Sequence, residues 1–577
     1  GIASALPKTE WEQLWQSEKA LTPQAELTSI LAALGRPEPD RDEALERITA
    51  VLTHTSEAYL RQQALRLIMI ALGDWNLHKP FTEVYTAYTL AEPLKRDQRE
   101  LLLPILRAAY PAPDSVSNFE ISRLLAMLMD DSPETVSKTV RFFTDEANPT
   151  TEFHYLVVLS RLRGAWPEGA VDQVANTVLR LDHKLEGREQ RSKQNWGKRL
   201  NEVIQKLNER EPAFAARLVA DPAFPTAGHL IFTEALEGEP LRQAATIYLK
   251  QVKENTQFQW SPTLVRLLGL LPSSETFPLF TNQWENMGLR ESLVIEFLKD
   301  QRPELRSFYL WGLNSPRPSI VAGSLNALLK FPPQSDRETL AALAKLFQRS
   351  FDEPRAAAIR KQGITLLRHS LGENQFWSSF QIDVEMEKRI DTVTSSTNVI
   401  KSELHSVLVP LLEGITRVNP EAVSQLQGVN WEEWRKRLSA ISWESGNIKR
   451  GESVFQMRAC ATCHSGAGSL GPDLRGAAKR FSPEDLFAAI VVPEKDVAPP
   501  YRPIVYQTRS GQLHTGIISF SSADGVILQT GPSMNVRLDD AEIISSQPAE
   551  GSLMPSGLLD GAQSQELADL YAYLKSL

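Results

Sequence analysis

The first two thirds of the chain follow a helical pattern almost throughout. Apolar residues recur three and four positions apart, as at Leu65, Ile68 and Leu72, in a segment without an internal helix breaker. Short clusters of proline, serine and acidic residues, such as 130–133, separate segments of this kind. Strand-like alternation is nearly absent from residues 1–380. Helix after helix joined by short turns predicts a mainly α chain that begins with an α-solenoid rather than a closed bundle.

Prolines indicate the repeat unit of this solenoid. Pro316 and Pro354 each open an apolar helical segment, and their separation is close to the ~40-residue unit of HEAT arrays. Residues 1–380 therefore resemble degenerate HEAT repeats, with proline at helix starts, where its missing N–H has no intrahelical partner. Pro104 interrupts another apolar run and predicts a helix start or a kink there.

The helical region lacks the motifs of a catalytic site. It contains no G-x-S-x-G, no H-E-x-x-H and no phosphate-binding glycine loop. Its histidines are scattered without metal-ligand spacing, which favours surface or packed positions: His54, His78, His154, His183, His229, His369 and His405. We expect the solenoid to offer a concave docking surface to a partner. Residues 381–445 are interpreted as a helical linker whose tryptophans, Trp431, Trp434 and Trp443, pack onto the domain that follows.

Both cysteines of the chain lie in one motif, Cys460-Ala461-Thr462-Cys463-His464. This C-x-x-C-H spacing lets two thiols form thioethers with the vinyl groups of one porphyrin edge, and it places the next imidazole under the iron. A disulfide would leave His464 without a role, and a zinc site would need further ligands, of which the nearest histidine is His514. The motif thus predicts one covalently bound haem c.

The residues around the motif resemble a class I cytochrome c domain over 446–577. The resemblance is carried by Gly451 and Phe455 in the first helix, by the loop 471–474 and by the last helix, 563–576. It implies that the carbonyl of Pro472 accepts the Nδ1–H of His464, which orients the ring. It also implies Met554 as the distal iron ligand.

Other residues could serve the haem. Met534 and His514 are rivals of Met554 for the sixth position, and Met457 lies on the motif side. A packing methionine is the alternative role of Met554. Lys479 and Arg480 are candidates for propionate contacts, or a solvated surface pair.

A segment rich in β-branched residues interrupts this domain at about 501–546. Runs at 504–508, 513–519, 526–530 and 536–544, separated by turn signals, predict four short strands in a small sheet or partly closed barrel. It could cover the distal side of the haem or present a docking surface.

The whole pattern is similar to the haem-binding cytochrome c domain of planctomycete and verrucomicrobial proteins. The run 450–474, the insert, Met554-Pro555, 557–559 and 570–574 carry this resemblance. HEAT-like repeats precede the domain in many relatives, and a β-propeller resembling sugar or sorbosone dehydrogenases precedes the repeats. This sequence has no propeller, so the resemblance implies that it was cut away or that the dehydrogenase is a separate protein.

Composition limits the partners and the compartment. A net charge of −9 argues against nucleic acid or an anionic membrane surface as the main partner, and no apolar run is long enough for a transmembrane helix. Because the chain starts at Gly1 without Met, we expect a processed or truncated form whose signal or anchor is not in view. The resemblance to cytochromes c implies a periplasmic or otherwise extracytoplasmic location.

Three hypotheses for the function follow. The first is single-electron transfer from a partner dehydrogenase acting on sugars or alcohols, with the solenoid as docking scaffold. The second is a haem enzyme or a sensor of gas or peroxide with a labile sixth ligand; the single C-x-x-C-H argues against a di-haem peroxidase. The third is a partner-binding scaffold with an ancillary haem.

Overall fold

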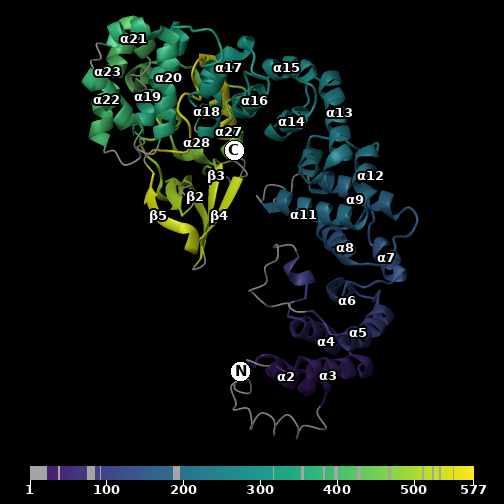
Figure 1. Cartoon of the computed structure of the whole chain (residues 1–577). Coiled ribbons are helices and arrows are strands. Elements are labelled where there is room, and N and C mark those ends of the chain that lie inside the picture. The colour runs from purple at the N-terminus through teal and green to yellow at the C-terminus, as the bar shows by residue number, and fades with distance from the viewer. Residues whose placement is uncertain are drawn as a thin grey trace. The chain divides into compact units, whose positions relative to one another are not determined.

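A computed structural model describes most of the chain. The described residues are 22–36, 39–73, 85–90, 93–185, 195–315, 317–352, 356–380, 384–395, 401–424, 430–464, 470–509, 513–522, 525–531, 534–549 and 551–577. They form two compact units, Gly1–Phe258 and Gln259–Leu577. Figure 1 shows the elements along the chain, and each unit is described by itself below. In the described part, no helix is long and apolar enough to cross a membrane.

The first unit is built from helices. Its elements are α2 (Pro23–Leu34), α3 (Arg41–His54), α4 (Ala58–Ala71), η2 (Thr86–Tyr88), α5 (Arg96–Ala109), α6 (Ser115–Met127), α7 (Pro133–Val140), α8 (Pro149–Arg161), α9 (Ala170–Leu185), α11 (Asn195–Arg210), α12 (Phe214–Ala220), η3 (Gly228–Ala235) and α13 (Gly238–Glu254). Each packs on helices close to it in the chain, as α3 does on α2 and α4 and as α8 does on α6, α9 and α11. The helical pattern of this region is therefore confirmed, while the HEAT-like repeat stays a prediction.

Local sequence explains where many of these helices begin. Pro23, Pro133 and Pro149 occupy the first turn of α2, α7 and α8, where an N–H would lack an intrahelical partner. The carboxylate of Asp114 accepts from the N–H of Ser117 at 2.8 Å and caps α6. Pro104 lies inside α5, so the prediction of a helix start at this residue is wrong.

The second unit begins with more helices of the same kind. They are α14 (Pro262–Leu268), α15 (Ser273–Asn282), η4 (Met287–Leu289), α16 (Arg290–Phe297), η5 (Pro303–Leu305), α17 (Arg306–Gly312), α18 (Pro318–Leu328), α19 (Arg337–Asp352), α20 (Ala357–Leu371), α21 (Glu373–Phe380), α22 (Val384–Ser395), α23 (Lys401–Val418) and α24 (Pro420–Ser424). Pro354 lies outside the described residues, as does Pro316. Neither proline can therefore be placed at a helix start.

The rest of the second unit forms the C-terminal domain. Its helices are α25 (Trp431–Ser439), η6 (Trp443–Ser445), α26 (Ile448–Met457), α27 (Cys460–Cys463), α28 (Ala477–Arg480), α29 (Pro483–Val491), η7 (Pro499–Tyr501) and α30 (Ser564–Ser576). Helices α26 and α30 cross in close contact. A Cβ built on Gly451 would lie 1.9 Å from the carbonyl oxygen of Asp569, so the crossing point admits only glycine. Below it, the rings of Phe455 and Tyr573 pack with centroids 5.2 Å apart.

The crossing is fixed by one buried carboxylate. Asp569 accepts from the Nε of Arg450 at 2.7 Å, from the backbone N–H of Asn447 at 2.7 Å and from the amide of Gln565 at 3.0 Å. Burial acts to raise the pKa of Asp569, but these donors outweigh it and the pKa lies below its usual value. The carboxylate thus joins the start of α26 to the middle of α30.

The three tryptophans between residues 431 and 443 pack against the core of this domain. Leu438 and Ile441 are buried in one cluster with Phe455, Phe487 and Leu570, and Trp431, Trp434 and Trp443 pack against that cluster. Trp443 also meets the ring of Phe487 at a centroid distance of 5.3 Å. Helix α25 is consequently part of the packed domain rather than a free connector.

A five-stranded antiparallel sheet stands between α29 and α30. Its strands are β1 (Ile504–Thr508), β2 (Leu513–Ser522), β3 (Gly525–Gly531), β4 (Met534–Asp539) and β5 (Ile543–Pro548), in the order β4-β3-β2-β1-β5. The inserted small sheet is confirmed, but the expected fourth strand is two strands separated by η8 (Asp540–Glu542). The polar run Asp539-Asp540-Ala541-Glu542 has low strand propensity, so the chain turns there and β5 returns to pair with β1.

Candidate haem site

The cysteine motif forms a single helical turn, α27. Ala459, directly before it, has a left-handed backbone with φ of 63°, which reverses the chain between α26 and α27. Cys460 is buried, Cys463 is half-buried, and the two do not form a disulfide. Burial raises the pKa of the Cys460 thiol to about 12 and also raises the pKa of Cys463. The turn holds both side chains and the following histidine in one compact segment.

The imidazole of His464 is held by a backbone carbonyl. Its Nδ1 lies 2.8 Å from the carbonyl oxygen of Pro472. A carbonyl oxygen can only accept, so Nδ1 carries the proton and the Nε2 lone pair is left for a metal. Burial lowers the pKa of His464, and the Pro472 hydrogen bond acts in the opposite direction. The contact thus fixes the neutral tautomer that can ligate iron.

Gly471 permits this contact because it has no side chain. A Cβ at this position would lie 2.6 Å from Cε1 and 2.8 Å from Nδ1 of His464, and 3.0 Å from the carbonyl oxygen of Cys463. Its own N–H donates to that carbonyl oxygen at 2.7 Å. The backbone of the 471–474 loop therefore forms one wall against the imidazole.

These residues fit a haem c. Two thiols three positions apart, followed by an imidazole with Nε2 available and Nδ1 engaged by a carbonyl, are the donor set that such a haem requires. Within the described residues, no three His, Cys, Asp or Glu side chains group as a metal-ion site. Cys460, Cys463 and His464 would hold the haem, and it would supply one-electron exchange at its iron.

The other sequence-predicted residues are spread over the domain. Met554 is half-buried in the irregular segment before α30, and its N–H donates to the hydroxyl of Ser552 at 3.1 Å. His514 lies on β2, opposite Tyr506 of β1. The side chain of Met534 lies outside the described residues. Lys479 and Arg480 are exposed on α28.

The helical part of the second unit also reaches the motif. Turn η4 contacts α26, and a Cβ on Gly288 would lie 3.2 Å from the hydroxyl of Thr462 and 3.5 Å from Cβ of Ala459. Arg290, the first residue after η4, stacks on the ring of Trp284 at 4.9 Å. Burial lowers the pKa of Arg290, and the positive charge of Arg458 adds to this effect. Sequence reasoning missed these residues because no local pattern links positions so far apart.

A second contact that the sequence did not reveal involves the distal segment. We call Leu558–Ala562 the distal loop, since it lies between Met554, the expected distal ligand, and α30. Nη1 of Arg458 donates to the carbonyl oxygens of Asp560 at 2.7 Å and Leu558 at 3.3 Å. Arg437 of α25 donates to the carbonyl oxygen of Ala562. Both arginines therefore hold the backbone of the same loop.

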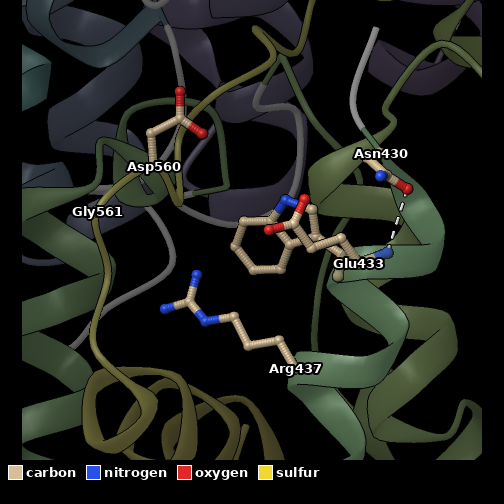
Figure 2. Close-up of a pocket in the computed structure, with 6 residues that line it drawn as sticks. Asn430, Glu433, Arg437, Asp560 and Gly561 are labelled. Carbon is tan, nitrogen blue, oxygen red and sulfur yellow. Dashed lines mark hydrogen bonds between the residues drawn. The ribbon is translucent and has the colours of Figure 1, made fainter.

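A small open pocket of about 280 Å³ lies beside this loop (Figure 2). Its lining comes from α25 and the distal loop: Asn430, Glu433, Trp434, Arg437, Asp560 and Gly561. Asn430 caps α25 by accepting from the N–H of Glu433 at 3.2 Å, and Arg437 stacks on Trp434 at 4.8 Å. The pocket is thus the gap that Arg437 spans between helix and loop.

The histidine of the helical region with the strongest pKa shift is a packed side chain. His154 is 8% exposed, with Nδ1 2.8 Å from the hydroxyl of Tyr88 and Nε2 2.8 Å from that of Ser122. Burial, aided by Arg123, lowers its pKa to about 3. Both ring nitrogens are engaged by hydroxyls, which is a structural arrangement rather than a ligand site.

Comparison with known proteins bears on the C-terminal domain. Residues 446–506 match the family model of cytochrome C oxidase, cbb3-type, subunit III. No curated protein sequence matches the chain. The match covers α26, the cysteine motif, the 471–474 loop, α29 and the first part of β1. This part of the chain is a cytochrome c domain, which implies haem c and haem-based electron transfer.

Proposed function

We propose that the chain is a mono-haem c-type cytochrome that passes single electrons between redox partners. The haem is attached through Cys460 and Cys463, and its iron is ligated by His464 and Met554. The observation that carries the proposal is the 2.8 Å contact between His464 Nδ1 and the Pro472 carbonyl oxygen, because it presets the imidazole for iron. The match of residues 446–506 to a cytochrome family model supports it.

The residues of the site do what electron transfer needs. The Pro472 carbonyl keeps the proton on Nδ1 of His464 and increases the donor strength of Nε2. Gly471 keeps that carbonyl close to the ring. A thioether from Met554 would favour the reduced iron and raise the potential relative to a second histidine. With His464 and Met554 both holding the iron, no position would be left for a substrate, and the haem would supply single-electron exchange.

The spectrum of the haem-loaded protein tests this proposal. We expect a low-spin ferric spectrum with the weak far-red band of methionine sulfur on iron. Met554→Ala is expected to remove that band and to lower the midpoint potential, whereas the control Met457→Ala, an exposed residue of α26, leaves both unchanged. A high-spin ferric resting state in the wild type would refute the axial pair.

The alternative function, a haem enzyme or sensor, needs a labile sixth ligand. Carbon monoxide added to the reduced protein, and peroxide added to the oxidised protein, test for one directly. Rapid binding or turnover in the wild type would favour this alternative over electron transfer.

The partner and the compartment are part of the same proposal. The electron donor is a dehydrogenase that oxidises sugars or alcohols, the HEAT-like helices serve as its docking scaffold, and the protein works in the periplasm. Packing of successive helices on their chain neighbours in the first unit supports a scaffold role. Reduction of the haem by a purified sugar dehydrogenase with its substrate, followed by stopped flow, tests the pairing. Failure with every dehydrogenase purified alongside the native protein would refute it.

A further inference from the structure

The distal loop is held from two directions by arginines that no motif singles out. Arg458 lies two residues before Cys460, and its side chain is 17% exposed. Its Nη1 donates to the carbonyl oxygens of Leu558 and Asp560, and its Nη2 lies 3.4 Å from the carboxylate of Glu566 on α30. One side chain thereby ties the haem-attachment segment to the loop that follows Met554.

The second arginine comes from outside the segment that matches the cytochrome family model. Arg437 on α25 donates to the carbonyl oxygen of Ala562, and its guanidinium stacks on Trp434. Trp434 packs against the core of the domain. Figure 2 shows the side chain of Arg437 extending from α25 toward the backbone of the distal loop at Gly561. Helix α25 therefore bears directly on the distal loop.

The loop is also anchored by the buried side chains of Leu558, Leu559 and Ala562, and the amide of Gln563 donates to the carbonyl oxygen of Gly561 at 3.3 Å. Gly557 and Gly561 have φ of 77° and 70°, and the loop is closed by two short turns, from Asp560 N–H to Gly557 and from Ala562 N–H to Leu559. Gly557 lies just before the loop and Gly561 near its end, and glycine lets the backbone change conformation unless other groups hold it. Among the described residues, the arginines make the charged hydrogen bonds to the backbone of this loop.

We propose that Arg437 and Arg458 are positioning residues for the sixth iron ligand. By holding the distal loop they keep Met554, four residues before Leu558, on the haem iron, so that the position of α25 affects the lability of this ligand. This inference rests on the proposed function, because it takes Met554 as the ligand. A partner that shifted α25 would weaken the methionine bond and change the potential without touching the haem.

Imidazole binding to the ferric protein tests the proposal, since imidazole must displace Met554. Loss of a hydrogen bond to a charged donor weakens the closed state about ten-fold or more. We therefore expect Arg437→Gln and Arg458→Gln to bind imidazole at least about ten-fold more tightly than the wild type. The pH at which the far-red band disappears should fall by about one unit, as the same ten-fold change requires.

Two further variants separate positioning from general damage. Arg435→Gln removes a charge from the same helix, at an exposed side chain that pairs with Glu432 at 3.2 Å, and should bind imidazole like the wild type. Arg437→Lys keeps the charge and a donor, so it should recover part of the wild-type affinity. Urea unfolding followed by far-UV circular dichroism identifies any variant that is globally unfolded. If a glutamine variant is unfolded, the imidazole affinity of Arg437→Lys is compared with that of the wild type instead.

The outcomes distinguish this inference from the proposed function. A wild-type protein without the far-red band refutes Met554 as ligand, and the positioning role is overturned with it. A wild-type band, together with imidazole affinities of Arg437→Gln and Arg458→Gln that equal that of Arg435→Gln, overturns the positioning role alone.

Discussion

Replacing Gly471 by alanine tests the wall that the 471–474 loop forms against His464. The added Cβ would lie 2.6 Å from Cε1 and 2.8 Å from Nδ1, where ordinary contacts begin at 3.4 Å, so the ring and the loop must separate by about 0.8 Å. Overpacking of this kind costs about 1–3 kcal/mol of folding stability. Gly471 has no positive φ, so the substitution adds no backbone strain of its own.

The same separation weakens the hydrogen bond from His464 to Pro472. Its net value is about 1 kcal/mol, and the donor strength that it gives to Nε2 stabilises the ferric state more than the ferrous state. Losing it should raise the midpoint potential by up to about 40 mV, because 59 mV corresponds to a ten-fold change in a one-electron equilibrium. Spectroelectrochemical titration of the haem-loaded protein measures this shift.

Gly476 provides the matched control. It lies in the same loop region with φ of 67°, and a Cβ there would meet nothing within 4 Å. Gly476→Ala should therefore cost about 1–2 kcal/mol through left-handed backbone strain while leaving the potential unchanged. Equal potentials for Gly471→Ala and the wild type, with complete haem incorporation in both, would refute the reasoning.

Two further predictions concern contacts that hold the domain together. Asp569→Asn should lower the free energy of unfolding at pH 7 by about 2 kcal/mol, since it removes the charged acceptor of Arg450. Because the folded pKa of Asp569 is lowered, its contribution is present above about pH 4 and is lost as pH falls further, so urea unfolding should depend less on acid in the variant. In Gly288→Val, the new Cβ would lie 3.2 Å from the hydroxyl of Thr462, and the larger side chain should push against the motif. We therefore expect faster amide hydrogen exchange in residues 457–464. Unchanged exchange there would show that η4 does not restrain the motif.

The parts of the site that sequence could anticipate are those fixed by neighbours in the chain. Cys460, Cys463 and His464 lie in one turn, and Pro472 is eight residues from His464, so a known motif brings them together. The runs of β-branched and aromatic residues at 504–508 and 526–530 located the insert because β-strand signals are local. Their roles toward iron stay predictions that the proposed spectra test.

The missed contacts share a different cause. Arg437 meets a carbonyl 125 residues away, and Arg458 meets one 102 residues away. When a side chain donates to a backbone carbonyl, the residue type of the acceptor cannot be used to predict the contact, because every residue has a carbonyl oxygen. The same holds for Gly288, whose contact with Thr462 depends on how η4 packs. Periodicity and spacing report local structure, so they cannot reveal partners of this kind.

The position of α25 changes what counts as the cytochrome domain. The family match begins at residue 446, yet Leu438 and Ile441 are buried in one cluster with Phe455 and Leu570, and Trp431 packs against it. Removing α25 would expose apolar surface at a cost of about 25 cal/mol per Å² and would release the distal loop from Arg437. Helix α25, which lies before the matched segment, is thus part of the packed haem domain. A shift of α25 has a direct structural route, through Arg437, to the loop that follows Met554.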